Sequence, residues 1–379
     1  MSLTEAIEEL RLVDHHVHTV LPGPVARADF ESYLTESDRP APPGTTQFDS
    51  QLGFALRRWC APLLDLDPGA SPEDYLAHRN SMPGTSAATR LLAAAGTGAL
   101  LVDTGFTAPG SLSLADLGGQ AGASVREVVR LESVAADLAL SGCSAGDFAA
   151  RYAEVLTQRT AGAVGLKSII AYRYGLDFDP ERPSAHEIRA AAGAWLRTVE
   201  ASGHARLAHP VLLRAVLWAG IDRGLPVQLH TGFGDPDLDL RRANPAAARD
   251  FLAAASSTGV PVILLHCYPF QREAAFLAQA YPNVYFDVGL ALHYVGARAV
   301  SVLAEALELA PFGKVLYSSD AYGLPELIYL GARLWRNAMA DVLGGWVAAG
   351  HWTEADAARV AGMIAAANAA RVYGLPFPD

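Results

Sequence analysis

Residues 225–266 of the chain read LPVQLHTGFGDPDLDLRRANPAAARDFLAAASSTGVPVILLH. Two apolar runs, Leu225–His230 and Val260–His266, lie on either side of a segment, Ala246–Ser257, that has the composition of a helix. Near-continuous runs of β-branched residues and leucine are typical of strands buried on both faces. The stretch therefore predicts one strand–helix–strand repeat of a parallel sheet, in which each strand ends in a histidine.

The same alternation extends along the chain in both directions. Six further apolar runs predict strands at Arg11–Val17, Gly98–Thr104, Val125–Glu132, Ala163–Lys167, Asn283–Val288 and Lys314–Asp320. Further segments predict helices at Ala145–Gln158, Ala185–Ser202 with Ser184 as N-cap, Pro210–Arg223, Arg272–Tyr281, Gly296–Leu309, Pro325–Leu343 and Thr353–Val372. Eight strands alternating with helices predict an α/β chain folded as a (β/α)₈ barrel of the TIM type, with a single domain over residues 1–379.

One connection, residues 19–97, is far longer than the others and contains two helix-like segments, Gln51–Leu64 and Ser71–His78. Connections of this length inside a domain are usually functional or carry their own helices. Because it leaves the C-terminal end of the first predicted strand, we expect it to cover the barrel mouth as a helical lid or specificity insertion. The alternative is a dimerisation arm.

The composition excludes several classes of partner. The chain has 379 residues, 51% hydrophobic and 18% charged, and its net charge is −11. This acidity argues against nucleic acid and against an anionic membrane surface, so a small-molecule substrate is expected. We expect a cytoplasmic protein, because the three cysteines (Cys60, Cys143 and Cys267) are widely separated and the sequence has no signal-like or membrane-spanning apolar stretch. A homodimer is the default expectation.

The first predicted strand ends in the sequence Asp14-His15-His16-Val17-His18. Side chains two positions apart in a strand point the same way, so His16 and His18 should project together into the barrel mouth. Two imidazoles in this arrangement can bind one metal ion.

Four other predicted strands also end in a residue suited to metal binding or catalysis. These residues are Lys167, His230, His266 and Asp320. Barrel enzymes carry their catalytic groups at the C-terminal ends of the strands. The alternative for each residue alone is a hydrogen-bonded core polar group, but the coincidence at five strand ends favours one shared site.

This order of residues resembles the amidohydrolase superfamily. The stretches SSDAYGLPEL (318–327), LGARLWRNA (330–338) and AYRYGL (171–176) are similar, more narrowly, to an amidohydrolase-related group. That group includes the N-terminal domains of nodulin- and FluG-type glutamine synthetase-like proteins. The resemblance implies that His16, His18 and Asp320 bind a divalent metal, expected to be zinc.

The resemblance leaves the number of metal ions open. In two-metal members the lysine that corresponds to Lys167 is carboxylated and bridges the metals, and the residues matching His230 and His266 bind the second one. In one-metal members His230 would join the single site and His266 would contact water or substrate. A third alternative is that Lys167 binds a substrate carboxylate directly.

The resemblance implies hydrolysis of a C–N bond in a small, carboxylate-bearing substrate by metal-activated water. Asp320 would be the general acid–base, and His266 would stabilise the oxyanion. Two further residues are candidates for substrate binding: Arg173, unless it is a surface arginine, and His293, unless it is an ordinary loop histidine.

Three other functions remain open. A metal-dependent non-oxidative decarboxylase of the same fold would need no bridging carbamate on Lys167. A sugar-acid isomerase is a more distant alternative. The third is a barrel that binds a metal or ligand without turnover, and metal content would separate this non-enzymatic alternative from the other two.

Overall fold

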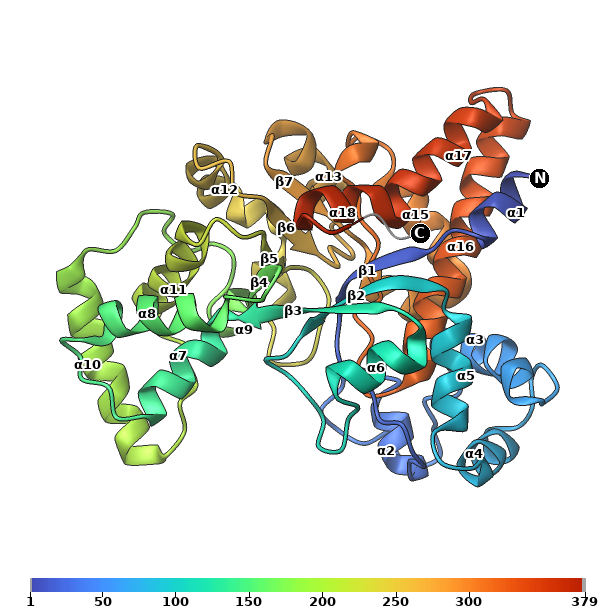
Figure 1. Cartoon of the computed structure of the whole chain (residues 1–379), viewed down its shortest axis with the longest axis horizontal. Coiled ribbons are helices and arrows are strands. Elements are labelled where there is room, and N and C mark those ends of the chain that lie inside the picture. The colour runs from blue at the N-terminus through green and yellow to red at the C-terminus, as the bar shows by residue number, and fades with distance from the viewer. Residues whose placement is uncertain (1, 377–379) are drawn as a thin grey trace. The chain divides into compact units, whose positions relative to one another are not determined.

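The computed structural model describes residues 2–376 (Figure 1), and the chain divides into two compact units. The first unit comprises the described parts of Met1–Val102, Phe106–Arg126 and Asp287–Asp379. The second comprises Asp103–Gly105 and Glu127–Phe286. Seven parallel strands follow one another in chain order, and strands β2 and β3 each contribute residues to both units.

The first unit is centred on β1 (Leu12–Val17), which is buried along its whole length. On one side β1 pairs in parallel with β2 (Thr97–Asp103). On the other side lies an irregular segment, residues 317–321. There the His15 N–H donates to the carbonyl of Tyr317 (3.2 Å), and the Asp320 N–H donates to the carbonyl of His16 (3.0 Å). This segment therefore occupies the place of the eighth predicted strand, without a regular ladder.

The first unit holds most of the helices. Before β2 they are α1 (Leu3–Glu8), α2 (Arg27–Ser32), α3 (Gln51–Trp59), the 3₁₀-helix η1 (Ala61–Leu64), α4 (Pro72–Ser81) and α5 (Ser86–Ala94). The others are α6 (Leu114–Ala121), α14 (Gly289–Val295), η4 (Gly296–Arg298), α15 (Ala299–Ala306), η5 (Phe312–Lys314), α16 (Pro325–Ala348), α17 (Glu354–Gly362), the π-helical turn η6 (Met363–Ala367) and α18 (Asn368–Tyr373). The long helix α16 packs against α1, α5, α14 and α15.

The connection over residues 19–97 is helical, as its two helix-like segments predicted. Gln51–Leu64 forms α3 and η1, and Ser71–His78 corresponds to α4, whose N-cap is Ser71. Helices α2 and α5 were not predicted. In Figure 1, α3, α4 and α5 lie together in blue and cyan. The role of this connection as a lid, and the organisation of residues 1–379 as one domain, stay predictions.

A buried ion pair fastens the connection to α16. The Arg79 guanidinium of α4 contacts the Glu326 carboxylate at 2.5 Å, and the two side chains are 1% and 0% exposed. Tyr75 donates its hydroxyl to the same carboxylate oxygen at 3.0 Å, and Arg79 lies over the ring of Phe30. Glu326 lies in the first turn of α16, where the helix dipole also favours an acidic group.

The second unit contains parallel strands β3 (Ser124–Arg130), β4 (Gly165–Ser168), β5 (Val227–His230), β6 (Val262–Leu265) and β7 (Val284–Phe286). Its helices are α7 (Leu131–Leu140), α8 (Phe148–Arg159), α9 (Ile170–Arg173), α10 (Ala185–Ser202), α11 (Pro210–Asp222), η2 (Leu240–Ala243), η3 (Pro245–Ala248), α12 (Arg249–Ser256) and α13 (Gln271–Ala280). Helix α10 has the predicted bounds, and Ser184 caps it in a capping box with Glu187.

The α/β class and the strands in chain order confirm the predicted fold class. Several strand ends differ from the prediction by one or two residues. Glu132 lies in the first turn of helix α7 rather than at the end of β3. Strand β6 ends at Leu265, so His266 and Cys267 follow the strand, with φ of 70° and 56°. Cys267 is fully buried.

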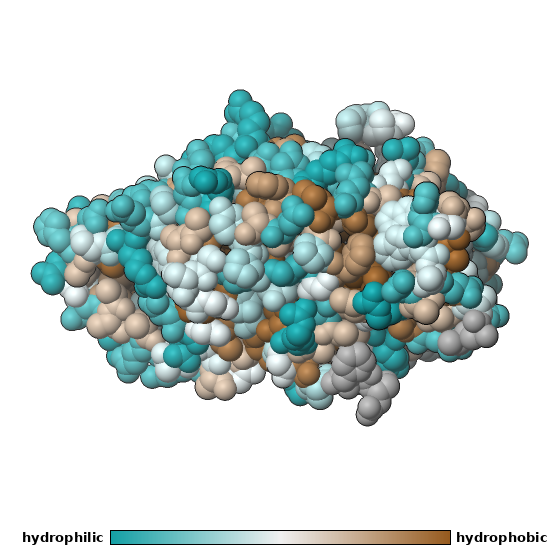
Figure 2. Space-filling view, turned by 90° about the horizontal axis from the view of Figure 1, so that it is seen from above, coloured by the Kyte–Doolittle hydropathy of each residue, from teal (hydrophilic) through white to brown (hydrophobic). Residues whose placement is uncertain are grey.

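The face of the molecule in Figure 2 carries small hydrophobic patches among hydrophilic residues. Large hydrophobic side chains that are exposed include Phe54 and Phe106, both in the first unit. Among residues 2–376, none of the helices combines the length and the apolar character that crossing a membrane requires.

Candidate functional site

Three of the predicted metal ligands meet in the first unit. The Asp320 Oδ1 atom lies 3.0 Å from Nε2 of His16 and 3.4 Å from Nε2 of His18. One ligand atom from each residue lies within 4.8 Å of the other two. The two imidazole rings are nearly perpendicular, with centroids 5.3 Å apart. The cluster is mostly buried, and Asp320 keeps 13% of its side chain exposed.

Backbone contacts with β1 fix the position of Asp320. Its N–H donates to the carbonyl of His16, and the His18 N–H donates to the carbonyl of Ala321 (2.9 Å). The neighbouring Ser319 N–H donates to Oδ1 of Asp14 at 2.9 Å. These contacts hold Asp320 at φ 50°, a left-handed conformation that non-glycine residues rarely adopt and that often marks a functional position.

Asp14 lies fully buried next to this cluster. Burial raises the pKa of Asp14 to about 7, against the lowering effect of its hydrogen bonds from Ser319, and the nearby Asp320 charge adds to the rise. Near neutral pH this carboxyl is therefore protonated part of the time. That protonation limits the negative charge beneath the cluster.

His15, between Asp14 and His16, contacts a different set of residues. Its Nε2 atom lies 3.0 Å from Oδ2 of Asp287, and its Nδ1 atom lies 3.1 Å from the hydroxyl of Tyr373 in α18. Asp287 also accepts the Gly289 N–H at 2.7 Å. His15, which is not among the predicted metal ligands, therefore joins β1 to α18.

The donor set of His16, His18 and Asp320 fits a divalent cation. Imidazole nitrogens and a carboxylate oxygen are ligands that zinc and other transition metals accept. The three atoms already converge, and two of the three side chains are buried, which excludes most competing water. Metal binding at these residues, and zinc as the metal, stay predictions.

The second unit brings His230 and His266 together. His230 is the last residue of β5, His266 follows β6 directly, and their ring centroids are 4.8 Å apart. The Tyr172 ring lies 4.3 Å from that of His230. Gly234 fits against them, because a Cβ at that position would lie 2.1 Å from the Tyr172 hydroxyl. Their predicted part in metal binding stays a prediction.

Lys167 is a buried residue of β4, 2% exposed, in register with Arg130 of β3 and Gln228 of β5. Its carboxylation stays a prediction. The next residue, Ser168, donates its hydroxyl to the buried carboxylate of Glu132 at 2.6 Å. Burial raises the pKa of Glu132. The sequence predicts Glu132 at the end of a strand. In the structure it lies in α7 and links this helix to the end of β4 through its hydrogen bond with Ser168.

The two predicted substrate-binding residues have other neighbours. Arg173, at the end of α9, pairs with Asp237 at 3.2 Å, and Arg206 pairs with the same carboxylate at 2.7 Å. Burial and the neighbouring Arg206 charge lower the pKa of Arg173. His293 is buried within α14, not in an open loop, and its ring lies 5.0 Å from that of Tyr294. Substrate contacts for both residues stay predictions.

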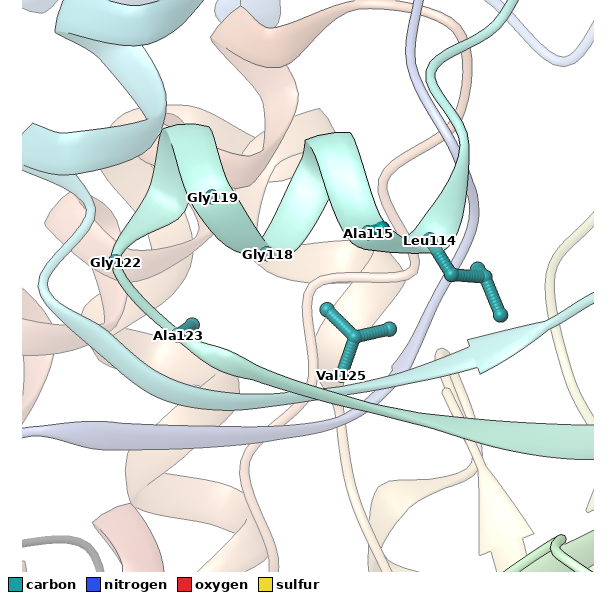
Figure 3. Close-up of a pocket in the computed structure, with 7 residues that line it drawn as sticks. All are labelled: Leu114, Ala115, Gly118, Gly119, Gly122, Ala123 and Val125. Atoms are coloured by element: carbon teal, nitrogen blue, oxygen red, sulfur yellow. The ribbon is translucent and has the colours of Figure 1, made fainter.

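A surface hollow of about 590 Å³ in the first unit has different chemistry. It lies between α6 and the start of β3, where Val125 points toward the helix (Figure 3). It is lined by Leu114, Ala115, Gly118, Gly119, Gly122, Ala123 and Val125. None of these seven residues carries an acid, a base or a nucleophile, so this hollow is not a candidate catalytic site.

Comparison with known proteins gives independent evidence on the family of the chain. The Amidohydrolase family profile matches residues 141–375, which include Lys167 and Asp320. The FluG protein of Emericella nidulans is 29% identical over 99% of this chain and 47% of its own length, so the chain spans about half of that relative.

Solved structures show the same fold. A Lactobacillus casei protein with the provisional description metal-dependent hydrolase is 29% identical, with a TM-score of 0.87, and the alignment covers 98% of this chain and 97% of that one. A uronate isomerase from Bacillus halodurans is 14% identical, with a TM-score of 0.64, and covers 99% and 96% of the two chains. The family match and the Lactobacillus casei relative support an enzyme of amidohydrolase type that uses a divalent metal. The family match covers more than half of the sequence, and the chain therefore belongs to the amidohydrolase family.

Proposed function

We propose that this protein hydrolyses a C–N bond in a small, carboxylate-bearing substrate. The observation that carries the proposal is the convergence of His16, His18 and Asp320, whose ligand atoms lie within 4.8 Å of one another. These three residues would hold a divalent metal. When bound, the metal would lower the pKa of water and polarise the scissile carbonyl.

Asp320 is the general acid–base in this proposal. Its side chain is 13% exposed, whereas those of His16 and His18 are 1% and 8% exposed, so the carboxylate is the member of the cluster most open to water. It would accept a proton from the attacking water and deliver it to the leaving amine. Because the backbone of Asp320 is fixed against β1, the carboxylate would not have to be reoriented during the reaction.

Other residues have proposed roles that rest on the family and on their positions. His266 would stabilise the oxyanion, His230 and Lys167 would bind metal, and Arg173 or His293 would bind the substrate. The support for the first three is their place at or just after the C-terminal ends of β6, β5 and β4.

The test combines metal analysis with a substrate screen. Protein loaded with zinc, manganese or cobalt would be assayed for amine release from N-acyl amino acids and γ-glutamyl amides. Asp320→Asn is expected to lower turnover by about 10²–10⁴-fold. Asp341→Asn, which changes an exposed carboxylate on α16, is the matched control and should leave turnover unchanged.

Two results would overturn the proposal. The first is a metal-loaded protein that isomerises uronates and releases no amine from any amide, since this would assign the isomerase chemistry of its structural relatives. The second is equal amine release by Asp320→Asn and the unchanged protein.

A further inference from the structure

Two arginines of the second unit share one carboxylate. Nη1 of Arg173 lies 3.2 Å from Oδ2 of Asp237, and Nη2 of Arg206 lies 2.7 Å from the same oxygen atom. Arg173 ends α9, Arg206 lies between α10 and α11, and Asp237 lies in the connection after β5. We call Arg173, Arg206 and Asp237 the arginine cluster. Three separate segments of the chain thus bring two positive charges to one acid.

Arg173 uses only part of its capacity as a hydrogen-bond donor. Its side chain is 21% exposed, and it donates to Asp237 through Nη1. Within the described residues 2–376, its Nε and Nη2 atoms donate no hydrogen bond. A guanidinium binds a carboxylate most strongly through two parallel N–H donors. Asp237 is 51% exposed, and ion pairs with exposed partners contribute little to stability, so another carboxylate can replace it at small cost.

The arginine cluster adjoins segments that contact His230, a proposed metal ligand in the same unit. Tyr172, the residue before Arg173, has its ring 4.3 Å from that of His230. Gly234, three residues before Asp237, lies against the same imidazole, because a Cβ there would fall 3.0 Å from Nε2 of His230. A small molecule held at the arginine cluster would therefore be bound next to the segments that contact this histidine.

We propose that Arg173 and Arg206 bind the carboxylate of the substrate, and that Asp237 occupies this place until the substrate displaces it. This inference deepens the proposed function and rests on its carboxylate-bearing substrate. The exchange preserves the charge balance, because one carboxylate replaces another between the same two guanidinium groups. The Asp237 N–H donates to Oδ1 of Asp235 at 2.8 Å, so its backbone can stay in place while its side chain rotates into water. Sequence reasoning predicted neither Arg206 nor Asp237 as a specificity residue.

Binding of a small carboxylate tests this inference without turnover. Levulinate carries a carboxylate and a ketone but no C–N bond, and the matching hydroxyketone replaces the carboxylate by a neutral hydroxymethyl group. Dissociation constants would be measured by saturation-transfer NMR on the full chain, both loaded with zinc and after treatment with a chelator. The variants are Asp237→Asn, Arg173→Gln, and Arg206→Gln combined with Asp237→Asn. The matched control is Asp222→Asn, because Asp222 forms an exposed pair with Arg182 at 2.7 Å in the same unit.

Levulinate is expected to bind more tightly than the hydroxyketone, with and without zinc. Arg173→Gln should weaken levulinate binding by about ten- to hundredfold, because hydrogen bonds to a charged group are lost. Asp237→Asn should tighten it by up to about fivefold, because the competing carboxylate of the chain is gone. Adding Arg206→Gln to that variant should remove the gain, and Asp222→Asn should leave levulinate binding unchanged.

Three results would overturn the inference. They are an Asp237→Asn variant that binds levulinate no more tightly than the unchanged protein, a preference for levulinate that disappears after chelation, and an Arg206→Gln change without effect. Failure of the substrate screen while these affinities follow the expected pattern would refute the hydrolase chemistry alone. Amine release from carboxylate-bearing amides without any of these changes in affinity would refute the arginine site alone.

Discussion

Replacing Arg79 with methionine should destabilise the protein far more than replacing Arg90, although each guanidinium lies 2.5 Å from a carboxylate oxygen. The Arg79–Glu326 pair is 1% and 0% exposed, whereas the Arg90–Asp65 pair is 47% and 72% exposed. Removing Arg79 leaves the Glu326 charge buried with the Tyr75 hydroxyl as a neutral donor. Removing one partner of a buried pair typically costs about 3–5 kcal/mol, whereas an exposed pair contributes about 0–1 kcal/mol.

The measurement is urea unfolding followed by intrinsic fluorescence, with the free energy of unfolding compared across the variants. Arg90→Met is the matched control, because it makes the same substitution in the same 19–97 connection. A double variant, Arg79→Met with Glu326→Met, leaves no unpaired charge in the interior. Its free energy of unfolding should therefore be higher than that of Arg79→Met, and the stability losses of the two single variants should not add.

Equal losses of stability in Arg79→Met and Arg90→Met would refute this reasoning. A double variant that loses the sum of its two single variants would also refute it, since the sum would mean that the two charges do not interact. Either result would show that burial of the pair does not determine its energetic role.

Three further outcomes are expected. Gly323→Ala should lower the melting temperature more than Gly350→Ala. Both glycines have positive φ (75° and 76°), but only a Cβ at position 323 would clash with the Tyr33 ring. Equal decreases in melting temperature would contradict this clash. In chelator-treated protein, the free energy of unfolding should fall as pH rises from about 4 to about 7. Over this range the unfolded chain releases the Asp14 proton readily, whereas the folded protein holds it, so deprotonation favours the unfolded state. A pKa shift from 3.8 to about 7 amounts to about 4 kcal/mol. The difference in free energy of unfolding, Asp14→Asn minus the unchanged protein, should therefore increase by up to that amount between about pH 4 and about pH 7. His16→Ala should lose bound metal in elemental analysis, and full retention of metal would remove His16 from the ligand set.

Local rules were enough to predict the core of the candidate site. Alternation along a strand placed His16 and His18 on one side of β1, and the parallel order of the strands placed Asp320 beside them. Both rules depend only on sequence spacing and on the direction of the chain. The regular helix α10 was predicted to the residue for the same reason, because its capping box is local.

Features without a local signal were missed. Arg79 and Glu326 are 247 positions apart, and nothing near either residue indicates that it is buried. The Lys314–Asp320 run was predicted as a regular strand, but Asp320 has a positive φ and the segment contacts β1 only irregularly. Pairing of His15 with Asp287 was missed because it depends on how distant elements pack.

The contacts of His15 link helix α18 to β1, the strand that carries the candidate metal ligand His16. Adjacent residues of β1 face opposite ways, so one backbone carries His16 toward Asp320 and His15 toward Tyr373. Loss of α18 would therefore remove a side-chain contact of the strand that carries His16. A truncated protein that stops before Tyr373 would lose more than a terminal helix, because His15, the neighbour of a candidate ligand, would lose a hydrogen-bond partner 358 positions away.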